Sequence, residues 1–154
     1  MYKNIVVPLD GSELSEKALA HAKDIGGGNA TIHVIRVFTA NPERGNITPS
    51  PTELGQSTSD TAEMARNLAE AQLADVENYL AAIVNQLTGE GINAQSEILH
   101  GSADDRIVNY AKQNNVGVIV MSTRGRGGVS RMLLGSITDR VIRAGEVPVL
   151  VIPS

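Results

Sequence analysis

Short apolar segments alternate with helical patterns along the 154 residues of the chain. Five segments are apolar, or alternate apolar and polar positions, over lengths that are typical of strands. They are residues 5–9, 31–38, 92–99, 116–121 and 147–152. Strands separated by helices indicate a parallel sheet that is covered on both faces. We therefore predict one α/β domain over residues 1–154, a doubly wound (Rossmann-like) parallel sheet with strand order 3-2-1-4-5 and helices on both faces.

The first and last helices carry recognisable end signals. Ser12 is placed to cap the first helix, which ends in the glycine run of residues 26–28. The last helix begins at Ser136, where Ser136 and Asp139 have the spacing of a capping box, and it stops at Gly145. A further helix is predicted over residues 103–113.

A long helix is predicted between the second and third strands, and it stops at residues 88–89. Before it, residues 39–60 are rich in proline, glycine and hydroxyl side chains, and we expect them to form a mobile loop. The apolar positions of the helix recur at helical spacing and predict a single buried stripe. That stripe comprises Met64, Leu68, Val76, Leu80, Ile83 and Leu87.

Two strands are predicted to lie at the edges of the sheet. Residues 92–99 alternate apolar and polar positions, as expected for a strand with one solvated face. Residues 147–152 are apolar but contain Pro148, which is tolerated mainly at sheet edges. Because an apolar edge strand needs a cover, we expect a homodimer that forms through this strand; a helix or loop of the same chain is the alternative.

Composition narrows the functional classes. The net charge of −4 and the small number of aromatic side chains argue against a nucleic-acid partner. The chain has no cysteine, it opens in a strand pattern without a secretory signal, and it has no apolar run long enough for a bilayer. We therefore expect a cytoplasmic protein without membrane insertion. Positive charge gathers near the C-terminus, where residues 113–154 hold five arginines against two acidic residues.

A glycine-rich turn follows the fourth strand, and it is the principal candidate site. Residues 122–128 contain three glycines and two arginines, and the last helix begins soon after them. Glycines allow backbone amides to approach an anion, and helix N-termini favour phosphate groups. In a doubly wound sheet the end of the first strand, with Asp10, meets this turn at the point where the winding reverses. Asp10 is either a turn residue or a ligand of a ribose hydroxyl or a nucleotide-bound Mg²⁺.

Taken together, these segments resemble the universal stress protein family over essentially the whole chain. The resemblance rests on residues 3–12, residues 100–102, the turn at residues 122–128, residues 133–136 and the terminal residues 147–152. The ATP-binding branch of that family carries the motif G-x2-G-x9-G-[S/T]. In this chain Gly125, Gly135 and Ser136 match the motif, whereas Ser122 stands at the first glycine position.

The resemblance implies a site for ATP or AMP. It places Gly125, Gly128, Gly135 and Ser136 along the phosphates, together with the backbone amide of Ile137. It places Pro8, Leu9 and Asp10 beside the adenosine, and the backbone of Val37 at the adenine edge. The strand end and turn contribute Met121, Ser122, Thr123, Arg124 and Arg126, and each arginine either contacts phosphate or lies in a solvated loop.

We find no catalytic constellation in the sequence. His21, His33 and His100 lack the short spacing of a metal cluster and are expected to be structural. We expect slow or no ATP turnover, at most weak hydrolysis or autophosphorylation. The favoured function is a homodimeric sensor or regulator that binds adenine nucleotide and acts on an unknown signalling protein. The alternatives are a nucleotide-free dimeric interaction module and a slow ATPase.

Overall fold

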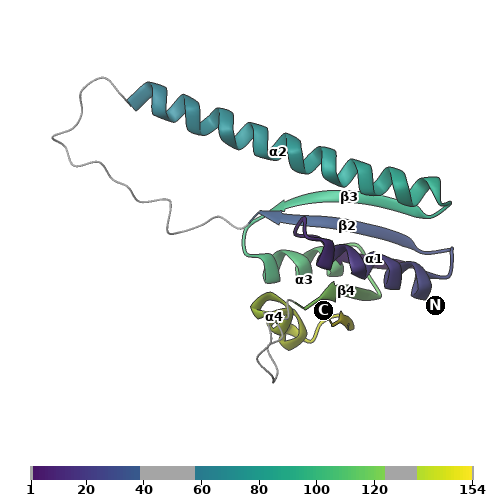
Figure 1. Cartoon of the computed structure of the whole chain (residues 1–154). Coiled ribbons are helices and arrows are strands. Elements are labelled where there is room, and N and C mark those ends of the chain that lie inside the picture. The colour runs from purple at the N-terminus through teal and green to yellow at the C-terminus, as the bar shows by residue number, and fades with distance from the viewer. Residues whose placement is uncertain (1, 39–57, 124–134, 154) are drawn as a thin grey trace.

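The computed structural model describes residues 2–38, 58–123 and 135–153 (Figure 1). Strands and helices alternate through these residues. The strands are β1 (Asn4–Pro8), β2 (Thr31–Phe38), β3 (Asn93–His100), β4 (Val118–Ser122) and β5 (Val149–Ile152). The helices are α1 (Glu13–Gly26), α2 (Thr58–Gly89), α3 (Ala103–Gln113) and α4 (Ser136–Ala144).

The five strands form one sheet in the order β3-β2-β1-β4-β5, with every neighbouring pair parallel. This confirms the predicted strand order. It also confirms that β3 and β5 are the edge strands. The chain leaves the sheet centre in one direction through β2 and β3 and in the other through β4 and β5, so the winding reverses between β1 and β4.

Helices cover both faces of the sheet, as predicted (Figure 1). The side chains of β1 alternate between the two cores: Ile5 and Val7 are buried against α1 and α2, whereas Val6 is buried against α3 and α4. All three side chains have no exposed surface. A central strand that is apolar on both faces is typical of parallel sheets, which accounts for the uninterrupted apolar runs in the sequence.

The end signals predicted for α1 are confirmed. Ser12 is the N-cap, and its hydroxyl accepts a hydrogen bond from the Ser15 amide at 3.2 Å. Gly27 closes the helix in the left-handed conformation. The preceding Gly26 is buried, and a Cβ built there would lie 2.9 Å from the Cβ of Ala30. Close packing of α1 on the sheet therefore needs glycine at position 26.

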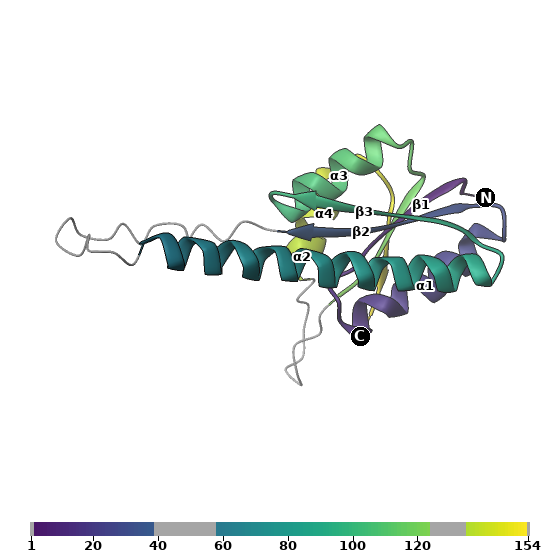
Figure 2. The ribbon, with the colours of Figure 1, turned by 90° about the horizontal axis from the view of Figure 1, so that it is seen from above.

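Helix α2 is the long helix that the sequence predicted, and it begins earlier in the chain than expected. Residues 58–60 are helical, so this part of the predicted loop is wrong, and the rest of that loop lies outside the described residues. The single-stripe prediction also fails in the first half of the helix. Leu80 is 1% exposed, but Met64 is 74% exposed and Leu68 is 60% exposed, because this half projects beyond the sheet (Figure 2).

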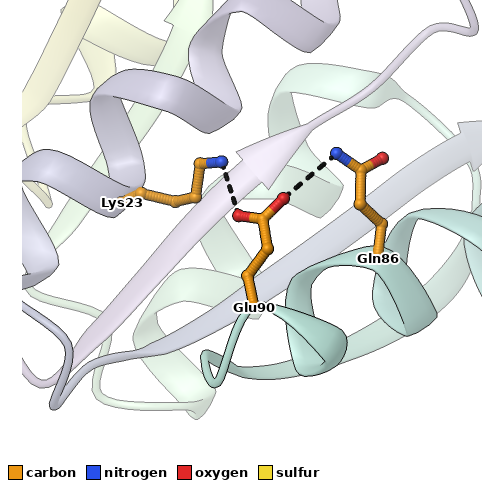
Figure 3. A network of polar contacts seen from close by, with 3 residues as sticks. All are labelled: Lys23, Gln86 and Glu90. Atoms are coloured by element: carbon orange, nitrogen blue, oxygen red, sulfur yellow. Dashed lines mark hydrogen bonds and ion pairs between the residues drawn. The ribbon is translucent and has the colours of Figure 1, made fainter.

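The other end of α2 is tied to α1 by polar contacts. The Nζ of Lys23 donates to Glu90 at 2.8 Å, and the Nε2 of Gln86 donates to the same carboxylate at 3.3 Å (Figure 3). These hydrogen bonds hold the pKa of Glu90 below its ordinary value. The ion pair is exposed, so its contribution to stability is small.

A buried histidine network joins the sheet to α3. His33 on β2 is 4% exposed, and its Nδ1 lies 3.0 Å from the Tyr110 hydroxyl and 2.9 Å from the Nε2 of Gln95. Its Nε2 lies 3.4 Å from the side-chain Oδ1 of Asn4. Burial lowers the pKa of His33, so the neutral ring is favoured. Within the residues that the structure describes, no group of three or more His, Asp or Glu side chains is arranged to hold a metal ion.

Strand β5 begins at Val149, two residues later than predicted, although the Pro148 carbonyl already accepts from the Ile119 amide at 2.9 Å. Val149, Leu150 and Val151 are only half-buried. Together with its position at the sheet edge, this leaves an apolar strand partly open to contact. Among the described residues, no helix is long and apolar enough to cross a membrane.

Candidate functional site

The candidate site lies where the carboxyl ends of β1 and β4 meet. These two strands are direct neighbours in the sheet, with Val6 in register with Ile119. Pro8 ends β1 and Ser122 ends β4, so Leu9 and Thr123 leave the same edge of the sheet. Helices α1 and α4 each begin at this edge, because each returns antiparallel to the strand before it. Four chain segments thus converge at the point where the winding reverses.

The turn between β1 and α1 is held by the side chain of Asp10. Its Oδ1 accepts hydrogen bonds from the Ser12 amide at 2.9 Å and from the Ser12 hydroxyl. The Asp10 amide in turn donates to the Ser15 hydroxyl at 3.3 Å. Gly11 has a φ of +83°, which glycine adopts without strain. Asp10 therefore has the role of a turn residue, which is one of the two roles that the sequence allowed for it. Its half-buried carboxylate lies at the sheet edge.

The start of α4 supplies the second part of the site. Gly135 is the N-cap residue and, having no side chain, it forms no side-chain cap with the first amides of this helix. The predicted capping box is therefore wrong: Ser136 is the first helical residue, and Asp139 accepts from the Arg143 Nε at 2.8 Å. The i,i+4 ion pair with Arg143 engages the Asp139 carboxylate with the next turn of the helix. Uncapped amides at a helix N-terminus are suited to an anion.

Gly135 is not required by the backbone of this fold. Its φ of −52° and ψ of 146° are available to any residue, and among the described residues a Cβ there would meet the Thr138 hydroxyl alone, at 4.0 Å. The described part of the chain therefore leaves space above the first turn of α4. Ser136 and Ile137 are exposed at that position, and Ile137 has 40% of its side-chain surface in solvent.

The remaining predicted residues divide between edge and core. Val37 is half-buried near the carboxyl end of β2 and packs against the α3 side of the sheet. Met121 is 6% exposed, and its side chain belongs to the core between the sheet, α3 and α4. Ser122 and Thr123 are half-buried, and the Thr123 amide donates to the Ile152 carbonyl at 3.0 Å. Arg124, Gly125, Arg126 and Gly128 lie outside the described residues.

A polar cluster that the sequence did not reveal lies beside the turn. Arg36 on β2 donates from Nη1 to the Leu9 carbonyl at 3.3 Å. The Tyr79 hydroxyl on α2 donates to Glu16 on α1 at 2.8 Å. Burial, the hydrogen bond to Glu16 and the negative charges of Glu16 and Asp10 raise the pKa of Tyr79 well above its ordinary range. One sequence signal could have indicated this cluster: Arg36 is a charged residue on the same strand face as the buried Ile32 and Val34.

Comparison with known proteins agrees with these observations. The sequence profile of the universal stress protein family matches residues 1–153. Universal stress protein MJ0531 of Methanocaldococcus jannaschii is 31% identical over 99% of this chain and 82% of its own length. The solved structure of hypothetical protein MJ0577, from the same organism, is 26% identical with a TM-score of 0.75, covering 100% of this chain and 97% of that one.

A plant protein of the same family has been solved with a nucleotide. The universal stress protein family protein from Arabidopsis thaliana with AMP bound has a TM-score of 0.67 and 18% identity, covering 98% of this chain and 91% of that one. At this level of identity the comparison shows a shared fold.

Proposed function

The chain belongs to the universal stress protein family, and we propose that it is an adenine-nucleotide-binding member that acts as a homodimeric stress sensor or regulator. The observation that carries this proposal is the start of α4, where Gly135 forms no side-chain cap and the described residues leave space, at the sheet edge where ligands of doubly wound folds bind. The AMP complex of a protein with the same fold supports the choice of ligand. A cytoplasmic location and a single folded domain belong to the same proposal.

The nucleotide would lie across the junction of β1 and β4. We assign the phosphates to the first amides of α4, with Gly135, Ser136 and Ile137, and to the turn that contains Gly125, Gly128 and the two arginines of residues 124–126. Met121, Ser122 and Thr123 lead into that turn. When bound, the nucleotide supplies the anionic group that pairs with the helix N-terminus, and this chain orients it through backbone amides.

The adenosine would occupy the β1 side of the junction. Pro8 supplies apolar surface, whereas Leu9, whose side chain lies in the core and which is 3% exposed, contributes through its backbone. Asp10 accepts from a ribose hydroxyl, and the backbone near Val37 contacts the adenine edge. Asp10 is suited to either a ribose or a nucleotide-bound Mg²⁺, since one carboxylate together with phosphate oxygens can hold that ion. ATP and AMP differ in how many amides of α4 and the turn they engage.

The homodimer would form through residues 147–152. β5 is an edge strand, and its valine and leucine side chains are half-buried in the isolated chain. Pairing with a second copy would give hydrogen-bond partners to the backbone groups at the outer edge of β5, and it would cover apolar surface. A change in nucleotide occupancy can be transmitted to a signalling protein only if the ligand binds one conformation better than another.

A second function is favoured by Ser122, which stands at the first glycine position of the nucleotide motif. A serine Cβ narrows the approach to a phosphate, so a nucleotide-free dimeric interaction module is the alternative. A slow ATPase would need a base near the terminal phosphate, and Asp10 is the candidate that the site offers.

Native mass spectrometry of the purified protein, followed by titration with AMP and with ATP, separates these functions. A dimer that takes up about one nucleotide per chain supports the sensor. A dimer that stays empty at millimolar nucleotide supports the interaction module. Release of phosphate or a protein mass increase of one phosphoryl group after ATP incubation would instead identify turnover.

A further inference from the structure

Arg36 occupies a strand position that would ordinarily hold an apolar side chain. Ile32 and Val34 precede it on the same face of β2 and are buried beneath α1 and α2. The Arg36 guanidinium instead reaches the turn between β1 and α1. Its Nη1 donates to the Leu9 carbonyl at 3.3 Å, and a Cβ built on Gly11 would lie 4.0 Å from the same nitrogen. A cation thus lies against the turn that carries Asp10.

Two acidic residues lie near the turn that this cation contacts. Asp10 follows β1, and Glu16 lies on the first turns of α1, where it accepts a hydrogen bond from Tyr79. The negative charges of Asp10 and Glu16 raise the pKa of the Tyr79 hydroxyl, and the positive charge of Arg36 lowers it. Arg36 and these two carboxylates therefore act on the same side chain beside the candidate site.

Packing alone does not account for this arginine. Its Nε is buried and finds no acceptor among the residues that the structure describes. A buried charged donor without a partner costs free energy, and an apolar side chain would cover the same core without that cost. The charge at this position is therefore better explained by what it does at the neighbouring turn.

We propose that Arg36 is a positioning residue of the nucleotide site, whose charge offsets those of Asp10 and Glu16 so that an anionic nucleotide binds beside Asp10 without a divalent cation. This inference rests on the proposed function. Two anions repel, so a phosphate compound held next to a carboxylate needs a compensating cation. Arg36 supplies that cation from the protein, which assigns Asp10 to the ribose rather than to Mg²⁺.

The test compares two substitutions that separate charge from hydrogen bonding. Arg36→Gln keeps a donor for the Leu9 carbonyl but removes the charge, whereas Arg36→Lys keeps the charge. Arg106→Gln is the matched control, since Arg106 is an exposed arginine on α3 near the same sheet edge. Affinity for AMP and for ATP is measured by titration calorimetry in EDTA and in Mg²⁺, and the thermal unfolding midpoint of each variant reports folding.

In EDTA, the wild-type protein and the Arg36→Lys and Arg106→Gln variants should bind with affinities within about threefold of one another, and Arg36→Gln should bind roughly tenfold more weakly or worse. Mg²⁺ should leave the wild-type affinity unchanged and recover part of the Arg36→Gln loss. In an Asp10→Asn background the Arg36→Gln effect should shrink, because the carboxylate that it compensates is gone.

Several results would overturn the inference. Wild-type binding that requires Mg²⁺, unchanged affinity of Arg36→Gln in EDTA, or equal losses in the Lys and Gln variants would each exclude charge compensation by Arg36. If Arg36→Gln does not fold, the Lys variant still decides, since its charge must preserve wild-type affinity. A wild-type protein that binds neither nucleotide under either condition overturns the proposed function together with this inference, so the two failures are distinguishable.

Discussion

Gly135 offers the sharpest separation of ligand binding from folding. Its backbone conformation is open to any residue, and within the part of the chain that the structure describes an added Cβ would meet the Thr138 hydroxyl alone, at 4.0 Å, which is an ordinary contact. We therefore expect Gly135→Ala to fold as the wild type does. The added methyl group would nevertheless occupy the space above the first amides of α4, where we place the phosphates.

The expected loss of stability in Gly135→Ala follows from the N-cap position of Gly135. Gly135 forms no side-chain cap on α4, so alanine removes no capping hydrogen bond and costs at most about 0.5–1 kcal/mol through its weaker N-cap preference. For a domain of this size that corresponds to a fall in the unfolding midpoint of only a few degrees. Loss of phosphate contact with the helix start should lower nucleotide affinity about tenfold or more, equivalent to at least ~1.4 kcal/mol. A valine at this position should abolish binding.

Gly26 provides a control with the opposite behaviour. A Cβ there would lie 2.9 Å from the Ala30 Cβ and 3.3 Å from the Ile5 Cδ1, so Gly26→Ala should destabilise the fold by about 1–3 kcal/mol. Gly26 ends α1 far from the site edge, and this variant should bind nucleotide normally at temperatures where it is folded. Thermal unfolding followed by circular dichroism, and calorimetric titration with ATP, measure both properties for each variant.

Normal ATP affinity in Gly135→Ala and in Gly135→Val would refute the placement of the phosphates at α4. A large fall in the unfolding midpoint of Gly135→Ala would show that this glycine serves the fold, contrary to the space that the described residues leave around it.

Three further predictions test other parts of the molecule. Burial lowers the pKa of His33, so the unfolded chain binds a proton before the folded one as pH falls. The free energy of unfolding should therefore decline from about pH 6.5 down to the pKa of His33 in the folded protein. In denaturant titrations, His33→Gln should flatten that decline, whereas His21→Gln, at an exposed histidine, should not. Leu80→Ala should cost about 2–5 kcal/mol by urea unfolding, whereas Leu68→Ala on the same helix should cost under ~0.5, and equal costs would contradict the burial difference. Asp10→Asn, which keeps an acceptor for the turn, should weaken ATP binding equally with and without Mg²⁺ if Asp10 serves the ribose; loss confined to Mg²⁺ would assign it to the metal.

Much of the architecture was predictable because one physical pattern repeats through the chain. Apolar runs with β-branched residues can be satisfied in a parallel sheet only by burial on two faces, and β1, with Val6 fully buried, meets that condition. The polar alternation that placed β3 at an edge reflects its solvated face. Ser12 and Gly27 mark the ends of α1 through local hydrogen bonding and backbone conformation, which depend little on distant parts of the chain.

The errors arose where tertiary context decides between local alternatives. Ser136 and Asp139 have capping-box spacing, but Arg143, one turn further along the helix, holds the Asp139 carboxylate, and Gly135 takes the cap position. Met64 has helical spacing with later apolar residues, but α2 extends past the sheet, and periodicity does not report where the opposing surface ends. The polar cluster around Arg36 was also missed, because it joins groups from β2, α1 and α2 that are distant in sequence.

The most direct test of the central claim is titration of the isotope-labelled protein with AMP, followed by backbone amide NMR shifts. Binding at the proposed site predicts large, saturable shifts for the amides of Ser136 and Ile137 at the start of α4 and for Asp10 and Gly11 in the β1–α1 turn. Amides near the buried His33 network, at the opposite end of the sheet, should remain unchanged. Absence of saturable shifts, or shifts confined to residues away from the β1–β4 junction, would contradict nucleotide binding at this site.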